Sequence, residues 1–432
     1  MAKKKAEGEE KKIDLKTLLG QINKKYGSGT VGIAASAQGL AIPRISFGVF
    51  ALDYVSGGGL PYGRITGFHG AKSCGKTSNA LRAIANSQTY CREHIVPMIP
   101  QDEKVFICPE CGSQGEAEGE FCEVCAERDI ESARVDVGRY KLLCPVCNQY
   151  NPMRTAWYDL EGAFVTSWAA KFGVDCSQLL LSRPESAEAG IDMLEEIMKT
   201  GEIDITVIDS IAALVPTAEI EGSMEDNNVG LQARLVNKML RKITSVMNKP
   251  GAGSAWRPTV LMINQIRQKV GVMYGSPDTL PGGMGQEFAT SLDIKFNPQK
   301  LISDKAGNPI YQISTFRCIK NKCSVPYRNA AFRMWLDYME GHYQTDTEEI
   351  GVVLKFAEKA GMFGNGKDGW KLGEQSFKTR KELLRHILSD VMIFRGVREE
   401  LLQYRFGELD TSDGGINMDV ITGNAEDGEN DE

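Results

Sequence analysis

The sequence predicts an α/β protein built around a doubly wound, mostly parallel β-sheet. Residues 70–77 read G-x-x-x-x-G-K-T and follow a short apolar stretch at 65–68. Further along, short runs rich in β-branched and aromatic residues alternate with longer segments of helical periodicity, a pattern typical of sheets covered by helices on both faces. Three of these runs end on polar residues, at the edge where such sheets bind their ligands.

Residues 70–77 are typical of a loop that binds the phosphates of a nucleotide. Its backbone N–H groups must wrap an anionic phosphate chain, and glycines let the backbone come close enough. Lys76 can then reach the outer phosphates, the Thr77 hydroxyl can bind Mg²⁺, and a helix predicted at 78–87 points its N-terminus at the phosphates. The residues of this loop expected to bind ATP are Gly70, Ala71, Lys72, Ser73, Cys74, Gly75, Lys76, Thr77 and Ser78.

Polar residues close three of the predicted strands. Asp209 follows a buried apolar strand and is a candidate ligand of Mg²⁺, bound directly or through water. Glu161 follows a second strand, where a carboxylate can orient and deprotonate the water that attacks a γ-phosphate. Asn264 and Gln265 end a third, where an amide can hydrogen-bond that phosphate. Each is an ordinary strand-end residue when taken alone, but together with the loop they predict ATP hydrolysis.

The chain is predicted to consist of five parts. These are an N-terminal arm at 1–43, an ATPase core at 44–338, an insertion within the core at 90–155, a small C-terminal α/β domain at 339–406 and an acidic, disordered tail at 407–432. After the phosphate loop, the core is expected to contain strands at 156–160, 203–208 and 259–263 and helices at 187–200 and 231–247.

The arm and the C-terminal domain are each expected to contain amphipathic helices. Apolar residues at helical spacing indicate a helix over 13–26, whose stripe could fold back on its own core or pack on a neighbouring subunit. The C-terminal domain is expected to have helices at 347–360 and 378–402 and a strand around Trp370 and Leu372. Basic residues of the last helix could bind duplex DNA or simply face solvent.

Composition and charge fit an ordinary globular protein. Of 432 residues, 42% are apolar and 25% charged, and no apolar run is long enough to span a bilayer. No apolar segment follows the basic N-terminus, so we expect a cytoplasmic protein without a secretory signal. The net charge is −7, and residues 407–432 carry nine acidic residues and no Lys or Arg, so removing those nine charges leaves +2. The tail could be a solubilising segment, or it could compete with nucleic acid for a basic surface.

Longer motifs resemble those of the bacterial RecA recombinases and suggest a phage or divergent member. The segments that carry the resemblance are 19–29, 51–53, 58–65, 209–222, 263–275, 320–322 and 358–361, and together they cover most of 13–405 apart from the insertion. The resemblance implies a RecA-like P-loop ATPase core. It also implies that Glu161 activates water and that Gln265 links the γ-phosphate to a DNA-binding loop. Trp168 would stack on adenine, and Lys320 and Lys322 would reach the ATP of an adjacent protomer.

The resemblance further implies two DNA-binding loops, at 221–230 and 266–283. The implied DNA-binding residues in or beside them are Val229, Gly230, Arg234, Arg241, Arg267, Lys269, Met273, Tyr274, Gly282 and Gly283. Basic side chains give sequence-independent contacts with phosphates, and apolar ones can separate bases. Without the resemblance, the same charges could belong to a solvated loop. Two positions depart from the family pattern, because Glu287 stands where a basic residue is usual and Val229 where methionine is usual.

The insertion contains cysteine pairs spaced as zinc ligands are. Cys108, Cys111, Cys122 and Cys125 form two C-x-x-C pairs and predict a zinc-ribbon-like site. A third pair, Cys144 and Cys147, lacks partners within that set. We expect a second Zn²⁺ site in which Cys91 and His94 complete it, although the pairing could instead be interleaved, with Cys108 and Cys111 meeting the third pair. Cys91 and His94 could also be chance residues at the end of a helix. The role of the insertion stays open, between contact with DNA or a partner and mere decoration.

These features predict an ATP-dependent DNA recombinase with roles in recombination, repair and the SOS response. It would form a helical filament on single-stranded DNA, pair that strand with a homologous duplex and exchange strands. One alternative is a zinc-bearing branch-migration helicase of the RadA type, although there the zinc segment precedes the ATPase. Another is a non-catalytic DNA-filament scaffold, against which Glu161 argues. Whether the protein promotes repressor cleavage is left open.

Overall fold

The computed structural model divides the chain into two compact units, residues 1–42 and 43–432. It describes residues 14–26, 42–103, 106–107, 114–115, 135–136, 139–221, 230–248, 257–268, 278–283, 285–297, 300–336, 353–354, 357–358, 360–363, 365–366, 369–389, 393, 396–398 and 400–401. Among these residues, no helix combines the length and the apolar character that a bilayer span requires.

The first unit contains helix α1 (Leu15–Tyr26), as its apolar spacing predicted. Asp14 begins the helix, because its carboxylate accepts hydrogen bonds from the backbone N–H of Thr17 (2.9 Å) and from the Thr17 hydroxyl (2.7 Å). Leu15 and Leu18 on the apolar stripe are 61% and 41% exposed.

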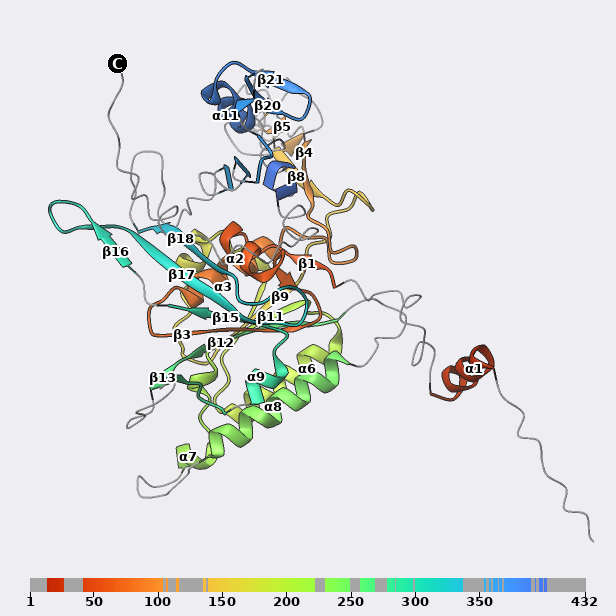
Figure 1. The fold of residues 1–432 in the computed structure, drawn as a ribbon. Helices are drawn as coiled ribbons and strands as arrows, with labels where there is room; N and C mark the ends of the chain where they lie inside the picture. Colours follow the sequence, from red (N-terminus) through yellow and green to blue (C-terminus); the bar gives the residue numbers. More distant parts are fainter. Residues whose placement is uncertain are drawn as a thin grey trace, which may run out of the picture. The chain divides into compact units, whose positions relative to one another are not determined.

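A nine-stranded sheet forms the centre of the second unit (Figure 1). Its order is β10 (Leu179–Ser182), β9 (Thr155–Asp159), β11 (Ile205–Asp209), β12 (Thr259–Gln265), β3 (Ile65–Gly70), β15 (Leu292–Phe296), β17 (Pro309–Asn321) and β16 (Lys300–Ser303), with β18 (Asn329–Trp335) also paired with β17. The strands from β10 to β15 are parallel, whereas β16, β17 and β18 pair antiparallel.

Helices cover both faces of the parallel part, so the prediction of a doubly wound sheet is confirmed. Side chains alternate along each strand. Trp157 and Val207 join the core that contains helix α3 (Lys76–Ser87), whereas their neighbours Tyr158 and Ile208 join the core formed with α6 (Ala187–Thr200) and α8 (Leu231–Met247). Both cores are buried, which explains the nearly continuous apolar runs of β9, β11 and β12.

Shorter elements surround this core. They are β1 (Arg44–Ile45), α2 (Phe50–Ser56), β2 (Leu60–Pro61), α5 (Thr166–Lys171), the 3₁₀ turns η2 (Cys176–Gln178) and η3 (Ile211–Ala213), α7 (Thr217–Glu221), β13 (Arg267–Gln268), β14 (Asp278–Thr279) and α9 (Gly285–Ala289). Within the predicted insertion, β4 (Ile99–Glu103) pairs with β8 (Arg139–Leu143), and β5 (Phe106–Ile107) pairs with β6 (Gln114–Gly115) and β7 (Val135–Asp136).

The C-terminal part of the second unit contains a small sheet and a helix that share an apolar cluster with α2. It contains β19 (Asn365–Gly366), β20 (Gly369–Leu372), β21 (Gln375–Phe377) and α11 (Arg380–Ser389). The strand predicted around Trp370 and Leu372 is therefore present as β20. Phe50 of α2 is buried in the same apolar cluster as Leu383 and Leu401, so this unit packs on α2.

Candidate functional site

The loop between β3 and α3 has the conformation that a phosphate-binding loop needs. Ser73 and Gly75 have φ angles of 57° and 87°, so left-handed residues alternate with others and turn successive N–H groups toward one side. A side chain on Gly70 would lie 2.3 Å from the Phe296 carbonyl oxygen, so only glycine fits there. The buried Lys76 Nζ donates to the carbonyls of Gly70 (3.2 Å) and Ala71 (2.6 Å), which hold the amine over the loop.

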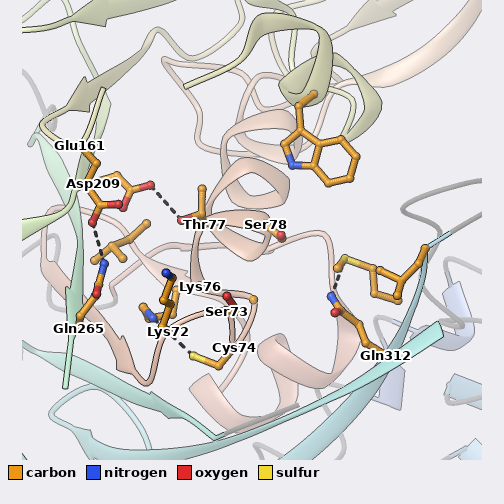
Figure 2. A pocket seen from close by; sticks show the side chains of 15 residues that line it. Lys72, Ser73, Cys74, Lys76, Thr77, Ser78, Glu161, Asp209, Gln265 and Gln312 are labelled. Atoms are coloured by element: carbon orange, nitrogen blue, oxygen red, sulfur yellow. Dashed lines mark hydrogen bonds between the residues drawn. The ribbon is translucent and has the colours of Figure 1, made fainter. Parts of the chain in front are cut away.

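This loop borders a cavity of about 450 Å³ (Figure 2). The cavity is lined by Lys72, Ser73, Cys74, Gly75, Lys76, Thr77, Ser78, Glu161, Trp168, Asp209, Ile263, Gln265, Gln312, Met334 and Leu336. The loop, Glu161, Asp209 and Gln265 follow or end β3, β9, β11 and β12, which are neighbours in the sheet. The carboxyl ends of four adjacent parallel strands therefore bring together polar residues that are far apart in sequence.

Glu161 lies at the centre of the polar wall of the cavity. Its Oε1 accepts a hydrogen bond from Gln265 Nε2 (2.9 Å) and another from the Ser210 hydroxyl. The neighbouring Asp159 is buried and has a structural task instead, because its carboxylate accepts the N–H groups of Ala163 (2.9 Å) and Phe164 (3.1 Å). Asp159 thus shapes the turn that leaves Glu161 exposed to the cavity.

Thr77 and Asp209 form the pair of oxygen groups expected to bind Mg²⁺. The Thr77 hydroxyl donates to Asp209 Oδ2 (3.0 Å). Burial raises the pKa of Asp209 to about 7, and the negative charges of Glu161 and Asp159 add to this, whereas the bond from Thr77 opposes it. The charge of Lys76 also opposes the shift, but Asp209 forms no ion pair with any residue that the structure describes. Such a buried carboxylate fits a divalent cation, which prefers hard oxygen ligands. The residues present therefore fit both the phosphates and the metal.

The raised pKa of Asp209 predicts that Asp209→Asn stabilises the nucleotide-free protein. The unfolded carboxylate titrates near 3.8 and the folded one near 7. Folding therefore favours the protonated form, and stability falls as the pH rises through this window. At pH 8 the substitution removes a buried negative charge, and we expect a gain on the order of 3 kcal/mol there. At pH 5, where the folded carboxyl is protonated, the gain is smaller.

Melting temperatures at the two pH values test this expectation. Asp192→Asn is the matched control, because hydrogen bonding to Lys242 lowers the pKa of that exposed carboxylate, and its removal stabilises nothing at pH 8. Equal increases in the melting temperature of Asp209→Asn at pH 5 and pH 8 would contradict the raised pKa of Asp209.

The remaining walls of the cavity consist of Trp168, which was predicted from the sequence, and of three residues that were not. Trp168 of α5 is 36% exposed, packs edge-on against Phe172 at 5.3 Å between ring centroids, and offers an aromatic face where an adenine could stack. Gln312, Met334 and Leu336 were not predicted. They come from β17 and from β18 and its end, where no sequence motif marks them.

Comparison with known proteins identifies the family. The model of the RecA N-terminal domain matches residues 13–99 and 140–342. The chain belongs to the RecA family. Protein RecA of Desulforapulum autotrophicum is 31% identical over 371 residues, which cover 85% of this chain and 86% of that protein. Protein RecA of Chlorobium chlorochromatii is 32% identical over 394 residues, 90% of each chain, and that of Amycolatopsis mediterranei is 32% identical over 373 residues, 85% and 86% of the two chains.

Membership in the RecA family implies a role in DNA recombination and repair, with ATP and Mg²⁺ as cofactors. The family match leaves out residues 100–139, which lie inside the predicted insertion at 90–155.

Asn264 and Gln265 of this RecA-family protein point to different surroundings. Asn264 is buried, and its Nδ2 donates to the Pro281 carbonyl (3.0 Å) and to Gln286 Oε1 (2.9 Å). Only Gln265 faces the cavity. The next residue, Ile266, donates its N–H to the Gly70 carbonyl (3.0 Å), so the segment after β12 is bonded to the start of the phosphate loop.

The predicted DNA-binding residues that the structure describes gather around α8 and the end of β12. Gly230 precedes α8 with a φ of 82°, and Arg234 and Arg241 are exposed seven residues apart, on one side of the helix. Lys238 is exposed between them and was not predicted from the sequence. Its spacing of four residues from Arg234 could have indicated that it lies on the same side of the helix. Arg267 is exposed in β13, which pairs with β14.

Gly282 and Gly283 have φ angles of 86° and 75° and pack beside α8. A Cβ on Gly282 would lie 2.9 Å from Val236 and one on Gly283 3.5 Å from Ala233, so this segment approaches the first half of the helix. Val229, Lys269, Met273 and Tyr274 lie outside the described residues.

Lys320 and Lys322 lie outside the cavity of their own chain. Lys320 Nζ donates to the carbonyl of Glu287, and Lys322 Nζ donates to that of Phe288 (3.3 Å). Phe288 beside them is 71% exposed. The expectation that both lysines reach the ATP of a neighbouring protomer stays a prediction.

The cysteines of the insertion fall into two sets. Cys108, Cys111, Cys122 and Cys125 lie outside the described residues. Cys91, His94, Cys144 and Cys147 come together, with ligand atoms that all lie within 4.8 Å of one another. Cys91 and Cys144 are buried, so Cys91 is not a chance residue on an exposed helix end.

Proposed function

We propose that this RecA-family protein is an ATP-dependent DNA recombinase. It forms a helical filament on single-stranded DNA, pairs that strand with a homologous duplex and exchanges strands. The observation that carries the proposal is the hydrogen bond between Gln265 and Glu161. It joins the expected catalytic carboxylate to the strand that continues into the predicted DNA-binding loop at 266–283.

Each polar group at the cavity has one task in hydrolysis. Lys76 and the N–H groups of the loop bind the phosphates and offset their charge. Thr77 and Asp209 hold Mg²⁺, which when bound stabilises the charge on the outer phosphates. Glu161 orients the attacking water and accepts its proton. Trp168 stacks on the adenine ring.

Gln265 couples the nucleotide to DNA. Its Nε2 donates to Glu161 Oε1, and we infer that the same amide contacts the γ-phosphate of bound ATP. Gln265 ends β12, one residue before the bond from Ile266 to Gly70, so this contact acts at the start of the predicted loop. The loop at 266–283 then adopts the state that holds DNA, with Arg267 and the exposed basic residues of α8 near the phosphates.

Assembly completes the proposed site. Lys320 and Lys322 are placed near α9 rather than over their own cavity, and we infer that they contact ATP bound to the adjacent protomer. Hydrolysis would then depend on the filament. We infer that the apolar stripe of α1, which includes Leu15 and Leu18, contacts a neighbouring copy.

Three measurements on one preparation test the proposal. We expect single-stranded DNA to stimulate ATP hydrolysis, a non-hydrolysable ATP analogue to produce helical filaments on that DNA in electron microscopy, and strand exchange to follow. Protein that stays unassembled on single strands with the analogue contradicts the proposal. Closed rings instead favour a branch-migration helicase, and filaments without hydrolysis favour a scaffold.

A further inference from the structure

Four side chains at the base of the insertion form a cluster that the proposed ATP chemistry does not use. His94 Nδ1 lies 3.6 Å from Cys91 Sγ and 3.6 Å from Cys144 Sγ, and Cys147 completes the group. With Zn–S bonds of about 2.3 Å and Zn–N bonds of about 2.0–2.1 Å, a tetrahedral zinc site places sulfur and nitrogen ligands about 3.5–3.6 Å apart. Both distances match this value, so one metal ion bound to all three atoms accounts for them.

The cluster is built from two turns with the same backbone structure. In each turn the N–H of the first ligand donates to the carbonyl five residues later, and the N–H four residues later donates back to the first ligand. The bonds are Cys91 N to Val96 O (2.8 Å), Ile95 N to Cys91 O (2.8 Å), Cys144 N to Gln149 O (3.0 Å) and Asn148 N to Cys144 O (2.8 Å). This repeated pattern presents two pairs of ligands to one point.

The residue after the second ligand has the same unusual conformation in both turns. Ile95 has a φ of 55° and Asn148 a φ of 54°. Asparagine tolerates this left-handed region, but a β-branched isoleucine rarely adopts it. An isoleucine in this conformation indicates that the turn must keep this backbone geometry. Ile95 packs on the main core, while the buried members of the local core among the described residues are Met98, Cys91 and Cys144.

Hydrogen bonds connect the cluster to the central sheet, at the amino-terminal ends of β9 and β11. Arg92, between the first two ligands, donates from Nε to Asp204 Oδ1 (3.1 Å), and the fully buried Asp204 directly precedes β11. Met153, just before β9, donates its N–H to the Tyr90 carbonyl (3.0 Å). The nucleotide cavity lies at the other ends of β9 and β11, so the cluster is separated from it by the length of these strands.

We propose that Cys91, His94, Cys144 and Cys147 bind one Zn²⁺ ion that fixes both ends of the insertion to the ATPase core. Four protein ligands leave no open position for a substrate, so the ion is structural. This site is independent of the proposed recombinase function. It is also independent of the zinc site predicted from Cys108, Cys111, Cys122 and Cys125.

Zinc content per chain of the full-length protein tests the proposal. We expect Cys91→Ser/Cys144→Ser to lose one ion relative to the parent protein, whereas Cys176→Ser, which alters a cysteine outside the cluster, loses none. His94→Ala should weaken zinc retention during dialysis against a chelator, and His94→Cys should restore it as a four-thiolate site. Equal zinc content in the parent and the double variant overturns the proposal.

A second measurement covers the case in which the double variant does not fold. Cys108→Ser/Cys122→Ser keeps all four proposed ligands, so we expect it to bind one Co²⁺ with the absorption spectrum of a tetrahedral, thiolate-rich site. Loss of all metal from this variant means that the cysteine pairs are interleaved, and an octahedral Co²⁺ spectrum means that the cluster is not the site. Either result overturns the proposal.

Discussion

Replacing Glu161 by glutamine is expected to slow ATP hydrolysis by about 10²- to 10⁴-fold, the range typical of a lost general base. Glutamine has the same shape, and its amide oxygen can still accept the bonds that Gln265 and Ser210 donate to Glu161. It cannot take a proton from water. ATP binding should therefore stay close to that of the parent protein, because Lys76, Thr77 and the phosphate loop are unchanged.

Single-turnover hydrolysis and the affinity for a fluorescent ATP analogue, both measured with single-stranded DNA, separate chemistry from binding. Glu196→Gln is the matched control, since Glu196 is an exposed acid on α6 away from the cavity. A Glu161→Gln protein that hydrolyses ATP within a few-fold of the control contradicts the role of Glu161. A loss of ATP affinity as large as the loss in hydrolysis rate would show that the substitution disturbed the cavity instead.

The site could be predicted from the sequence wherever local signals mark the end of a parallel strand. Asp209, Glu161 and Gln265 each follow a short apolar run, and parallel strands place their carboxyl ends at one edge. The long helices were equally clear, and α6 and α8 have the predicted boundaries because their apolar positions repeat over several turns. These parts of the fold are specified by residues close together in the chain.

The antiparallel half of the sheet could not be predicted in this way. β17 is thirteen residues long, yet its burial alternates only in part, and its pairing with β15 contains an irregularity at Asp293 and Ile294. Gln312 reaches the cavity from that strand, far along the chain from the phosphate loop. No local pattern distinguishes it from other polar residues of that part of the chain. Cys91 and His94, in contrast, were grouped with Cys144 and Cys147 from their spacing as one of two pairings, and the structure brings these four side chains together.

A buried ion pair between Asp53 and Arg398 was also invisible in the sequence. Asp53 on α2 is fully buried, and its carboxylate accepts bonds from the Ser46 hydroxyl (2.5 Å), the Phe47 N–H (2.7 Å) and the Arg398 guanidinium. Burial raises the pKa of Asp53, and Arg398 opposes that shift. Arg398 also lies over the Phe50 ring at 6.0 Å, so one side chain links the C-terminal unit to α2 by charge and by packing.

Arg398→Ala is expected to destabilise the protein by about 3–5 kcal/mol at pH 8, because it leaves a buried carboxylate without its positive partner. The loss should be smaller at pH 5. Burial raises the pKa of Asp53, and removing Arg398 takes away the positive charge that opposes this rise. A carboxyl group whose pKa is higher in the folded than in the unfolded state makes the protein less stable as the pH rises, so the variant should lose more stability at pH 8. Denaturant unfolding at the two pH values measures both the size and the direction of the effect.

Arg380→Ala provides the control, since Arg380 pairs with Glu358 (2.9 Å) in the same C-terminal unit but in a partly exposed position. Such a pair contributes at most about 1 kcal/mol, with little change between pH 5 and pH 8. Adding Asp53→Asn to Arg398→Ala removes the stranded charge and should recover part of the loss at pH 8. Equal losses for the two arginine variants, or no recovery in the double variant, would mean that Arg398 acts through packing on Phe50 rather than through the carboxylate.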